Sequence, residues 1–243
     1  MVKVMIDAGH GGHDPGALGS RSKEKDNVLK VAKRLKVLLE SHGHTVRLTR
    51  STDVFLSLSE RARLANGWGA DYFISLHDNS ATSTTATGFE TFIHNGPVQS
   101  KTVGFQNAIH AAIIKEIGIR DRGKKRANFA VLRETRMPAV LVEYAFISNA
   151  NDESVLINEV EKLAQLTADG IVNYVGSIKP AAPPKKEVKP VSNKPSSWAE
   201  TPWKKATENG IVDGTNPTVP LTREQFVVIL ERLGLNKDIK TGK

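Results

Sequence analysis

The sequence predicts an α/β fold: a twisted, mostly parallel but mixed sheet flanked by helices, followed by a small helical C-terminal domain. Two observations predict it. Short apolar runs alternate with helix-like segments over residues 2–175, which favours strands joined by helical crossovers. Residues 179–195 then hold five of the eleven prolines among lysines and alanines, which is typical of an extended linker. We therefore assign residues 1–178 to the α/β domain, 179–195 to the linker and 196–243 to the small helical domain.

The first half of the chain shows a β-α-β-α-β pattern. Apolar residues at helical spacing mark two helices, of which Gly43 ends the first, and a capping box of Ser57 and Glu60 opens the second. In chain order, the predicted elements are a strand at 2–6, a helix from about 28 to 39, a strand at 45–49, a helix from about 58 and a strand at 71–77.

The second half departs from strict alternation. Residues 78–87 are too few for a parallel crossover, so we expect the strand at 88–93 to pair antiparallel. The further predicted elements are a helix at 99–117, a mostly extended basic segment at 122–133, a strand at 139–142, a loop at 147–153, a helix at 160–175 and two helices in the tail, one ended by Gly210 and one capped by Thr222 and Gln225.

Composition excludes several classes of site and partner. The chain has no cysteine, so disulfides, thiolate nucleophiles and thiolate metal sites are excluded. The net charge of +8 favours an anionic partner, but no stretch interleaves aromatic and basic residues as nucleic-acid surfaces do, so we expect no nucleic acid. The N-terminus has no signal-peptide pattern, and no apolar run is long enough to span a membrane.

Three apolar runs each lead into a side chain that can bind a metal or move protons. The first strand leads to His10, the third ends at His77, and the strand at 139–142 ends at Glu143. Ligands gather outside the carboxyl ends of strands in open α/β sheets, so these side chains define one candidate site. Glu24 lies at or just before the first turn of the first helix.

Two imidazoles and one carboxylate are a typical ligand set for a catalytic zinc ion, which leaves one position for water. His10, Glu24 and His77 supply that set for a single Zn²⁺ ion. The metal would lower the pKa of its water toward 7, and a further carboxylate must then move protons. Glu143, which follows an apolar strand, suits this catalytic role. A carboxylate buried there without a partner is costly, so a functional role accounts for its position.

Each of these residues also has a simpler interpretation when it is taken alone. The Gly-His-Gly-Gly segment fits a tight loop, and Glu24 fits a carboxylate favoured by the helix dipole. His77 fits a core histidine bonded to backbone, and Glu143 fits one half of a salt bridge to a nearby arginine. The four residues together favour the metal site, although no His-Glu-x-x-His motif is present.

Motifs through residues 2–178 resemble the zinc-dependent N-acetylmuramoyl-L-alanine amidases of the type 3 amidase family. The segments that carry the resemblance are His10–Ala17, Glu24, Leu48–Arg50 with Asp53, Arg61, Ala65–Asn66, Ser75–His77, Gly88–Glu90, Arg122–Lys124, Phe129–Arg133, Pro138–Glu143 and Phe146–Asn149. The resemblance implies cleavage of the amide between N-acetylmuramic acid and L-alanine in peptidoglycan. It also implies that His10, Glu24 and His77 bind zinc and that Glu143 is catalytic.

The chain departs from this family at two places. Asp78 stands where a small residue usually follows the ligand histidine, which adds a carboxylate beside the metal and affects substrate fit or metal affinity. Tyr144 and Ala145 precede Phe146 where a glycine is frequent. The sequence assigns no substrate-binding residues.

The C-terminal tail resembles one S-layer homology-like wall-binding repeat. The resemblance rests on the segments Trp198–Trp203, Glu208–Ile211, Asp213–Gly214 and Leu221–Phe226. A segment of about 40 residues is near the lower limit for folding alone, so we expect the tail to self-associate, to pack on the first domain or to be only marginally stable.

A catalytic domain, a basic linker and a small wall-binding tail without a signal peptide are the layout of bacteriophage endolysins. We therefore expect a protein that is made in the host cytoplasm and reaches the bacterial wall after the membrane is permeabilised. Its expected partners are peptidoglycan and the anionic wall polymers that would attract a basic linker. The alternatives are a host autolysin of the same activity, a zinc peptidase that cuts the stem peptide, and a wall-binding protein without catalysis.

Overall fold

The computed structural model describes residues 1–176, 194–212 and 223–233. The chain divides into two units, Met1–Ala181 and Ala182–Lys243, and each is described by itself. No helix in the described ranges is long and apolar enough to cross a membrane. The predicted linker at 179–195 and the Thr222 cap lie almost wholly outside the described residues, so these two predictions stay untested.

The first unit is built on one six-stranded sheet with the strand order β2-β1-β3-β6-β4-β5. The strands are β1 (Lys3–Ala8), β2 (Thr45–Leu48), β3 (Tyr72–Asn79), β4 (Phe89–His94), β5 (Asp121–Ala127) and β6 (Ala139–Phe146). The pairs β1–β2, β1–β3 and β3–β6 are parallel, and β4 runs antiparallel to β6. The predicted mixed α/β sheet is therefore confirmed, with β5 added parallel to β4 at the edge.

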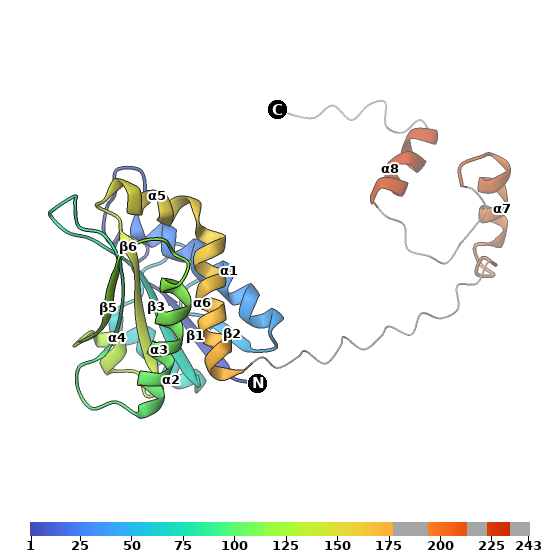
Figure 1. The fold of residues 1–243 in the computed structure, drawn as a ribbon. Helices are drawn as coiled ribbons and strands as arrows, with labels where there is room; N and C mark the ends of the chain where they lie inside the picture. Colours follow the sequence, from blue (N-terminus) through green and yellow to red (C-terminus); the bar gives the residue numbers. More distant parts are fainter. Residues whose placement is uncertain (177–193, 213–222, 234–243) are drawn as a thin grey trace. The chain divides into compact units, whose positions relative to one another are not determined.

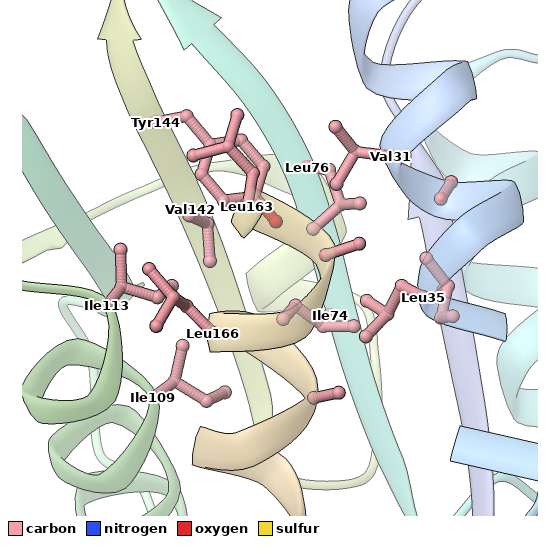
Figure 2. Packing of buried hydrophobic residues seen from close by; sticks show 14 of the residues in the cluster. Val31, Leu35, Ile74, Leu76, Ile109, Ile113, Val142, Tyr144, Leu163 and Leu166 are labelled. Atoms are coloured by element: carbon pink, nitrogen blue, oxygen red, sulfur yellow. The ribbon is translucent and has the colours of Figure 1, made fainter. Parts of the chain in front are cut away.

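Three helices cover one face of this sheet (Figure 1): α1 (Glu24–Ser41), α3 (Ser100–Ile114) and α6 (Val160–Val175). Their apolar stripes meet the β-branched and aliphatic side chains of the central strands in the main core. Figure 2 shows this core, in which Leu35, Ile109 and Leu163 from the three helices surround Ile74 of β3 and Val142 of β6. Burial of such side chains contributes about 1.5–3 kcal/mol each, so this layer holds the central strands in place.

The second face carries a smaller core beneath α2 (Leu58–Trp68) and the short helix α4 (Ala130–Arg133). Phe73 of β3 and Leu141 of β6 lie in this cluster with Ala65 of α2 and Leu132 of α4. Successive side chains of a strand point to opposite faces, so His77 and Glu143 share the face of Phe73 and Leu141. The two polar residues stand toward the carboxyl ends of their strands, beyond this small core.

Two predicted segments differ from the structure. The expected loop at 147–153 contains the start of α5 (Ala150–Asn158), so that prediction was wrong at its second half. The side chain of Asn149 caps this helix by accepting hydrogen bonds from the backbone of Asn151 and Asp152, which stabilises the first turn. The basic segment at 122–133 is extended only to Ala127, because residues 130–133 form α4.

The second unit has two described helices, α7 (Glu200–Glu208) and α8 (Arg223–Arg232). Both were predicted from the sequence. Helix α7 buries none of its residues, and Trp198 before it is 84% exposed. Phe226 of α8 is also exposed. These helices therefore present apolar side chains that nothing in the described part of the unit covers.

Candidate metal centre

His10 is placed by the loop that follows β1. Its backbone φ is 59°, a left-handed conformation that non-glycine residues rarely adopt. Buried Arg61 of α2 stabilises this turn, since its guanidinium donates to the carbonyl oxygens of Ala8 and His10 at 2.7 Å each and also pairs with Asp7. Arg50 donates to the carbonyl of Gly9 at 2.7 Å. Two arginines thus hold the backbone that aims the His10 side chain.

Glu24 lies at the first residue of α1, and its side chain is almost fully buried. Its Oε1 atom lies 3.0 Å from Nε2 of His10 and 2.8 Å from Nδ1 of His77. Its Oε2 atom accepts a hydrogen bond from the backbone of Ala17. The carboxylate therefore stands between two imidazoles, with one oxygen fixed by the loop that precedes the helix.

His77 extends from β3, where the predicted buried strand is confirmed. A Cβ atom placed on Gly9 would lie 2.3 Å from Cε1 of His77, so this close contact requires glycine. The rings of His10 and His77 meet edge to face, with 5.0 Å between centroids. The loop after β1 and the end of β3 consequently pack directly against each other at the site.

One ligand atom each from His10, Glu24 and His77 lies within 4.8 Å of the others. The structure thus brings together the three residues that the sequence predicted as ligands, from the loop after β1, from α1 and from β3. Their donor set of two nitrogens and one oxygen fits a zinc ion with one position left open. That they bind zinc stays a prediction.

The charges around the site favour the binding of a cation. Burial raises the pKa of Glu24, but its hydrogen bonds and attraction to both histidines outweigh burial and hold that pKa far below its usual range. Burial lowers the pKa of His10, but Glu24 and Asp14 outweigh it and raise the pKa overall. The cluster therefore already favours positive charge beside the Glu24 carboxylate, which is the position a cation would take.

Asp14 supports His10 from behind. Its Oδ2 atom lies 2.8 Å from Nδ1 of His10, and its Oδ1 atom accepts from the backbone of Gly16. A carboxylate on the second ring nitrogen fixes the tautomer and orientation of a metal-binding histidine. Nε2, the nitrogen that faces Glu24, is thus left as the one available for a metal.

Glu143 lies directly opposite His77 in the parallel pairing of β3 with β6. Its Oε2 atom is buried and has no hydrogen-bond partner among the residues that the structure describes. Burial, followed by repulsion from Glu24, Asp78 and Glu90, raises its pKa well above the usual value. Glu143 forms no ion pair within the described residues, so it is not the half of a salt bridge that one interpretation of the sequence proposed. An unpartnered buried carboxyl oxygen is costly, which favours a functional role for it.

The sequence indicated a basic segment at 122–133 but did not place it in a charged cluster next to Glu143. Glu90 of β4 faces Glu143 in the antiparallel register, and its carboxylate pairs with Arg122 at 2.9 Å and with Lys125, both from β5. Asn79 donates to its other oxygen at 2.6 Å. The signal was present in the Gly88–Glu90 and Arg122–Lys124 motifs, but only the strand register places them beside the site.

Asp78, the unusual residue after His77, is buried and turned away from the ligand set. Its Oδ2 atom accepts from Asn27 of α1 at 3.0 Å, while its backbone N–H donates to Glu24. Because neighbouring strand residues point to opposite faces, its carboxylate lies on the α1 side of the sheet. This geometry gives no support to the expected effect on substrate fit. The alternative expectation, an effect on metal affinity, stays a prediction, because the backbone of Asp78 contacts the ligand Glu24.

The comparisons with known proteins agree with the fold and with the family that the sequence resembles. The family model described as N-acetylmuramoyl-L-alanine amidase matches residues 4–173. The sporulation-specific N-acetylmuramoyl-L-alanine amidase of Bacillus subtilis is 43% identical over 70% of this chain and 67% of its own length. The endolysin of Bacillus phage SPP1 is 43% identical over 79% of this chain and 73% of its own length.

Solved structures match the same region. The catalytic domain of CwlV, an N-acetylmuramoyl-L-alanine amidase from Bacillus (Paenibacillus) polymyxa, is 39% identical with a TM-score of 0.69, and the match covers 73% of this chain and all of that domain. An N-acetylmuramoyl-L-alanine amidase from Clostridium difficile 630 is 36% identical with a TM-score of 0.68, covering 71% of this chain and 96% of that one. This chain therefore belongs to the Amidase_3 family of N-acetylmuramoyl-L-alanine amidases.

Proposed function

We propose that this protein is a zinc-dependent amidase of the endolysin type that cleaves the bond between N-acetylmuramic acid and the L-alanine of the stem peptide. One observation carries the proposal: His10, Glu24 and His77 converge beside Glu143, whose buried oxygen has no partner among the described residues. Family membership supports the reaction class. The similarity to a phage endolysin over 79% of the chain supports the biological role, with action at the wall after the host membrane is permeabilised.

His10, Glu24 and His77 would hold the zinc ion, and Asp14 would orient His10. When bound, zinc would lower the pKa of a coordinated water toward 7 and polarise the carbonyl that it contacts. A positive charge in the site also lowers the pKa of Glu143, because it offsets the repulsion from Glu24 and Glu90.

Glu143 then acts as the general base and acid of the reaction. Its carboxylate takes a proton from the water that attacks the lactyl carbonyl carbon, which becomes a carboxyl group when the C–N bond breaks. The same proton passes from Glu143 to the leaving nitrogen, which departs as the free amine of L-alanine. One water molecule supplies the OH of the new carboxyl group and the hydrogen of the new amine.

The test is digestion of purified peptidoglycan followed by mass spectrometry. We expect intact stem peptides with a free L-alanine amine; a free amine only at an inner residue would instead identify a peptidase. Metal analysis should find one zinc per chain in the native protein and none in His77→Ala. Failure to find zinc in the native protein, or full retention in the variant, contradicts the metal assignment.

The Glu143→Ala variant separates an enzyme from a wall-binding protein. We expect unchanged zinc content and a rate lower by about 100- to 10,000-fold, which is the usual contribution of a general acid-base group. Unchanged turnover in this variant removes Glu143 from the mechanism. A native protein that binds walls but releases no stem peptide would be the binding protein without catalysis.

A further inference from the structure

The sheet edge has different chemistry on the two sides of the candidate metal centre. In the strand order β2-β1-β3-β6-β4-β5, the centre lies at the middle of the sheet, where His10 follows β1 and His77 and Glu143 lie in β3 and β6. The loop after β2 lies on one side, and β4 and β5 lie on the other. A substrate that has groups on both sides of its reacting bond can therefore extend over both sides when that bond reaches the centre.

The β2 side is apolar and exposed. Val54, Phe55 and Leu58 are 45%, 43% and 57% exposed, although large apolar residues that cluster within five positions normally find cover. His13, itself exposed, stacks on the Phe55 ring with 4.1 Å between centroids and 37° between planes. The pair offers an exposed aromatic surface beside the loop that carries His10.

This surface is fixed to the loop that carries His10. The side chain of Asp53 accepts from the backbone of Gly12 at 2.8 Å and pairs with Lys25 at 2.7 Å, and Lys25 also donates to the Gly12 carbonyl at 2.9 Å. His13 is three residues from His10, so their Cα atoms are at most about 11 Å apart. The aromatic pair thus lies within reach of a group attached to the reacting bond.

The β5 side is basic. Arg122 and Lys125 both contact Glu90, so two positive charges meet one carboxylate and leave a surplus of one. Both side chains remain about one-third exposed, at 30% and 37%. Arg122 also lies over the Phe146 ring, 4.7 Å from its centroid, which fixes its plane next to Glu143's strand. Carboxylates are the ligands that such a surface favours.

The two halves of the proposed substrate differ in the same way. N-acetylmuramic acid is a ring with an uncharged apolar face, which packs well on aromatic side chains, whereas the stem peptide carries free carboxylates. We propose that the glycan lies over His13 and Phe55 on the β2 side, and that the acidic stem peptide runs along Arg122 and Lys125 on the β5 side. This inference rests on the proposed function. It fixes the direction in which the substrate crosses the sheet.

The experiment compares two soluble probes: a disaccharide-tripeptide muropeptide and the same tripeptide carrying only its lactyl group. Binding is measured by calorimetry in the zinc-loaded Glu143→Ala protein, which does not turn the probes over. We expect Phe55→Ala to weaken binding of the muropeptide by about 3- to 10-fold, the value of an aromatic contact, and to leave the lactyl-tripeptide unchanged. In the otherwise native enzyme, the same variant should raise KM only for the muropeptide.

A second variant tests the other side. Lys125→Gln should weaken binding of both probes by a similar factor, and should have no effect when the peptide carboxylates are amidated. Val37→Ala removes an exposed apolar side chain from α1, at 53% exposure, and serves as the control that changes neither probe. Phe55→Tyr keeps the ring and should retain muropeptide affinity.

The outcomes separate this inference from the function on which it rests. If the native enzyme cleaves the muropeptide but Phe55→Ala weakens both probes equally, the peptide occupies the aromatic surface and the direction is reversed. If Phe55→Ala changes neither probe, the surface binds no substrate and the inference is wrong. If the native enzyme cleaves neither probe, the proposed function fails first and the inference falls with it.

Discussion

At the scale of single residues, two glycines offer a matched test of the site. A Cβ on Gly9 would clash with the His77 ring at 2.3 Å, whereas a Cβ on Gly67 in α2 would meet nothing within 4 Å. We expect Gly9→Ala to displace His77 and to abolish most zinc binding. Gly67→Ala should keep zinc and stabilise the protein by about 0.5–1 kcal/mol, because alanine favours a helix interior. Zinc content and thermal unfolding of both variants check this, and normal zinc in Gly9→Ala would contradict the geometry.

Asp14 makes the second residue-scale prediction. Because it touches His10 but is not one of the three converging ligands, Asp14→Asn should leave one zinc per chain at saturating metal. Its zinc affinity should fall by about 10- to 100-fold, the usual effect of losing such a carboxylate. Competition with a chelator of known affinity measures this. The control is Asp121→Asn, which alters a histidine contact at His110, away from the three ligands.

At the scale of elements, the sequence predicted what local patterns can encode. The buried strand before His77 and the antiparallel strand at 88–93 follow from composition and loop length. Helix α5 was missed because its cap and first turn contain Asn149, Asn151 and Asp152, residue types that also favour turns and loops. The burial of Arg61 was not predictable from its helix, because its partners, Asp7 and the carbonyls of Ala8 and His10, come from a distant strand and loop.

Helix α5 has a structural role that pH should reveal. Glu153, in its first turn, accepts hydrogen bonds from Ser20, Ser22 and the backbone of Arg21, and its side chain is 1% exposed. Burial raises its pKa, but these hydrogen bonds outweigh burial and lower the pKa to about 2. The contact therefore ties α5 to the loop that leads into Glu24.

A lowered pKa in the folded state gives a stabilisation that is complete above the unfolded pKa of 4.5 and is lost as the pH falls toward 2. We expect Glu153→Gln to cost about 2 kcal/mol of unfolding free energy at pH 7. Urea unfolding at several pH values should show this difference shrinking below pH 4.5. A difference that is constant from pH 7 to pH 3 would mean that the carboxylate charge does not contribute.

At the scale of the whole molecule, the candidate site draws on a single unit. Its residues come from the loop after β1 and from α1, β3 and β6, all within Met1–Ala181. The solved catalytic domain of CwlV is matched along its entire length by 73% of this chain. Residues 182–243 hold 11 Lys or Arg and 7 Asp or Glu, so they supply four of the eight net positive charges. The second unit therefore carries half of the net positive charge and none of the residues of the candidate site.

This division predicts how a truncated protein behaves. A chain of residues 1–181 should fold and cleave a soluble muropeptide with a kcat/KM close to that of the full chain, because no predicted site residue is removed. Its retention on purified walls should fall, since both the tail that resembles a wall-binding repeat and half of the net charge are lost. Retention of the full chain should also decrease more steeply with salt, because exposed charges are screened. Co-sedimentation with walls at low and high salt measures both effects, and equal retention of the two proteins would remove the tail from wall binding.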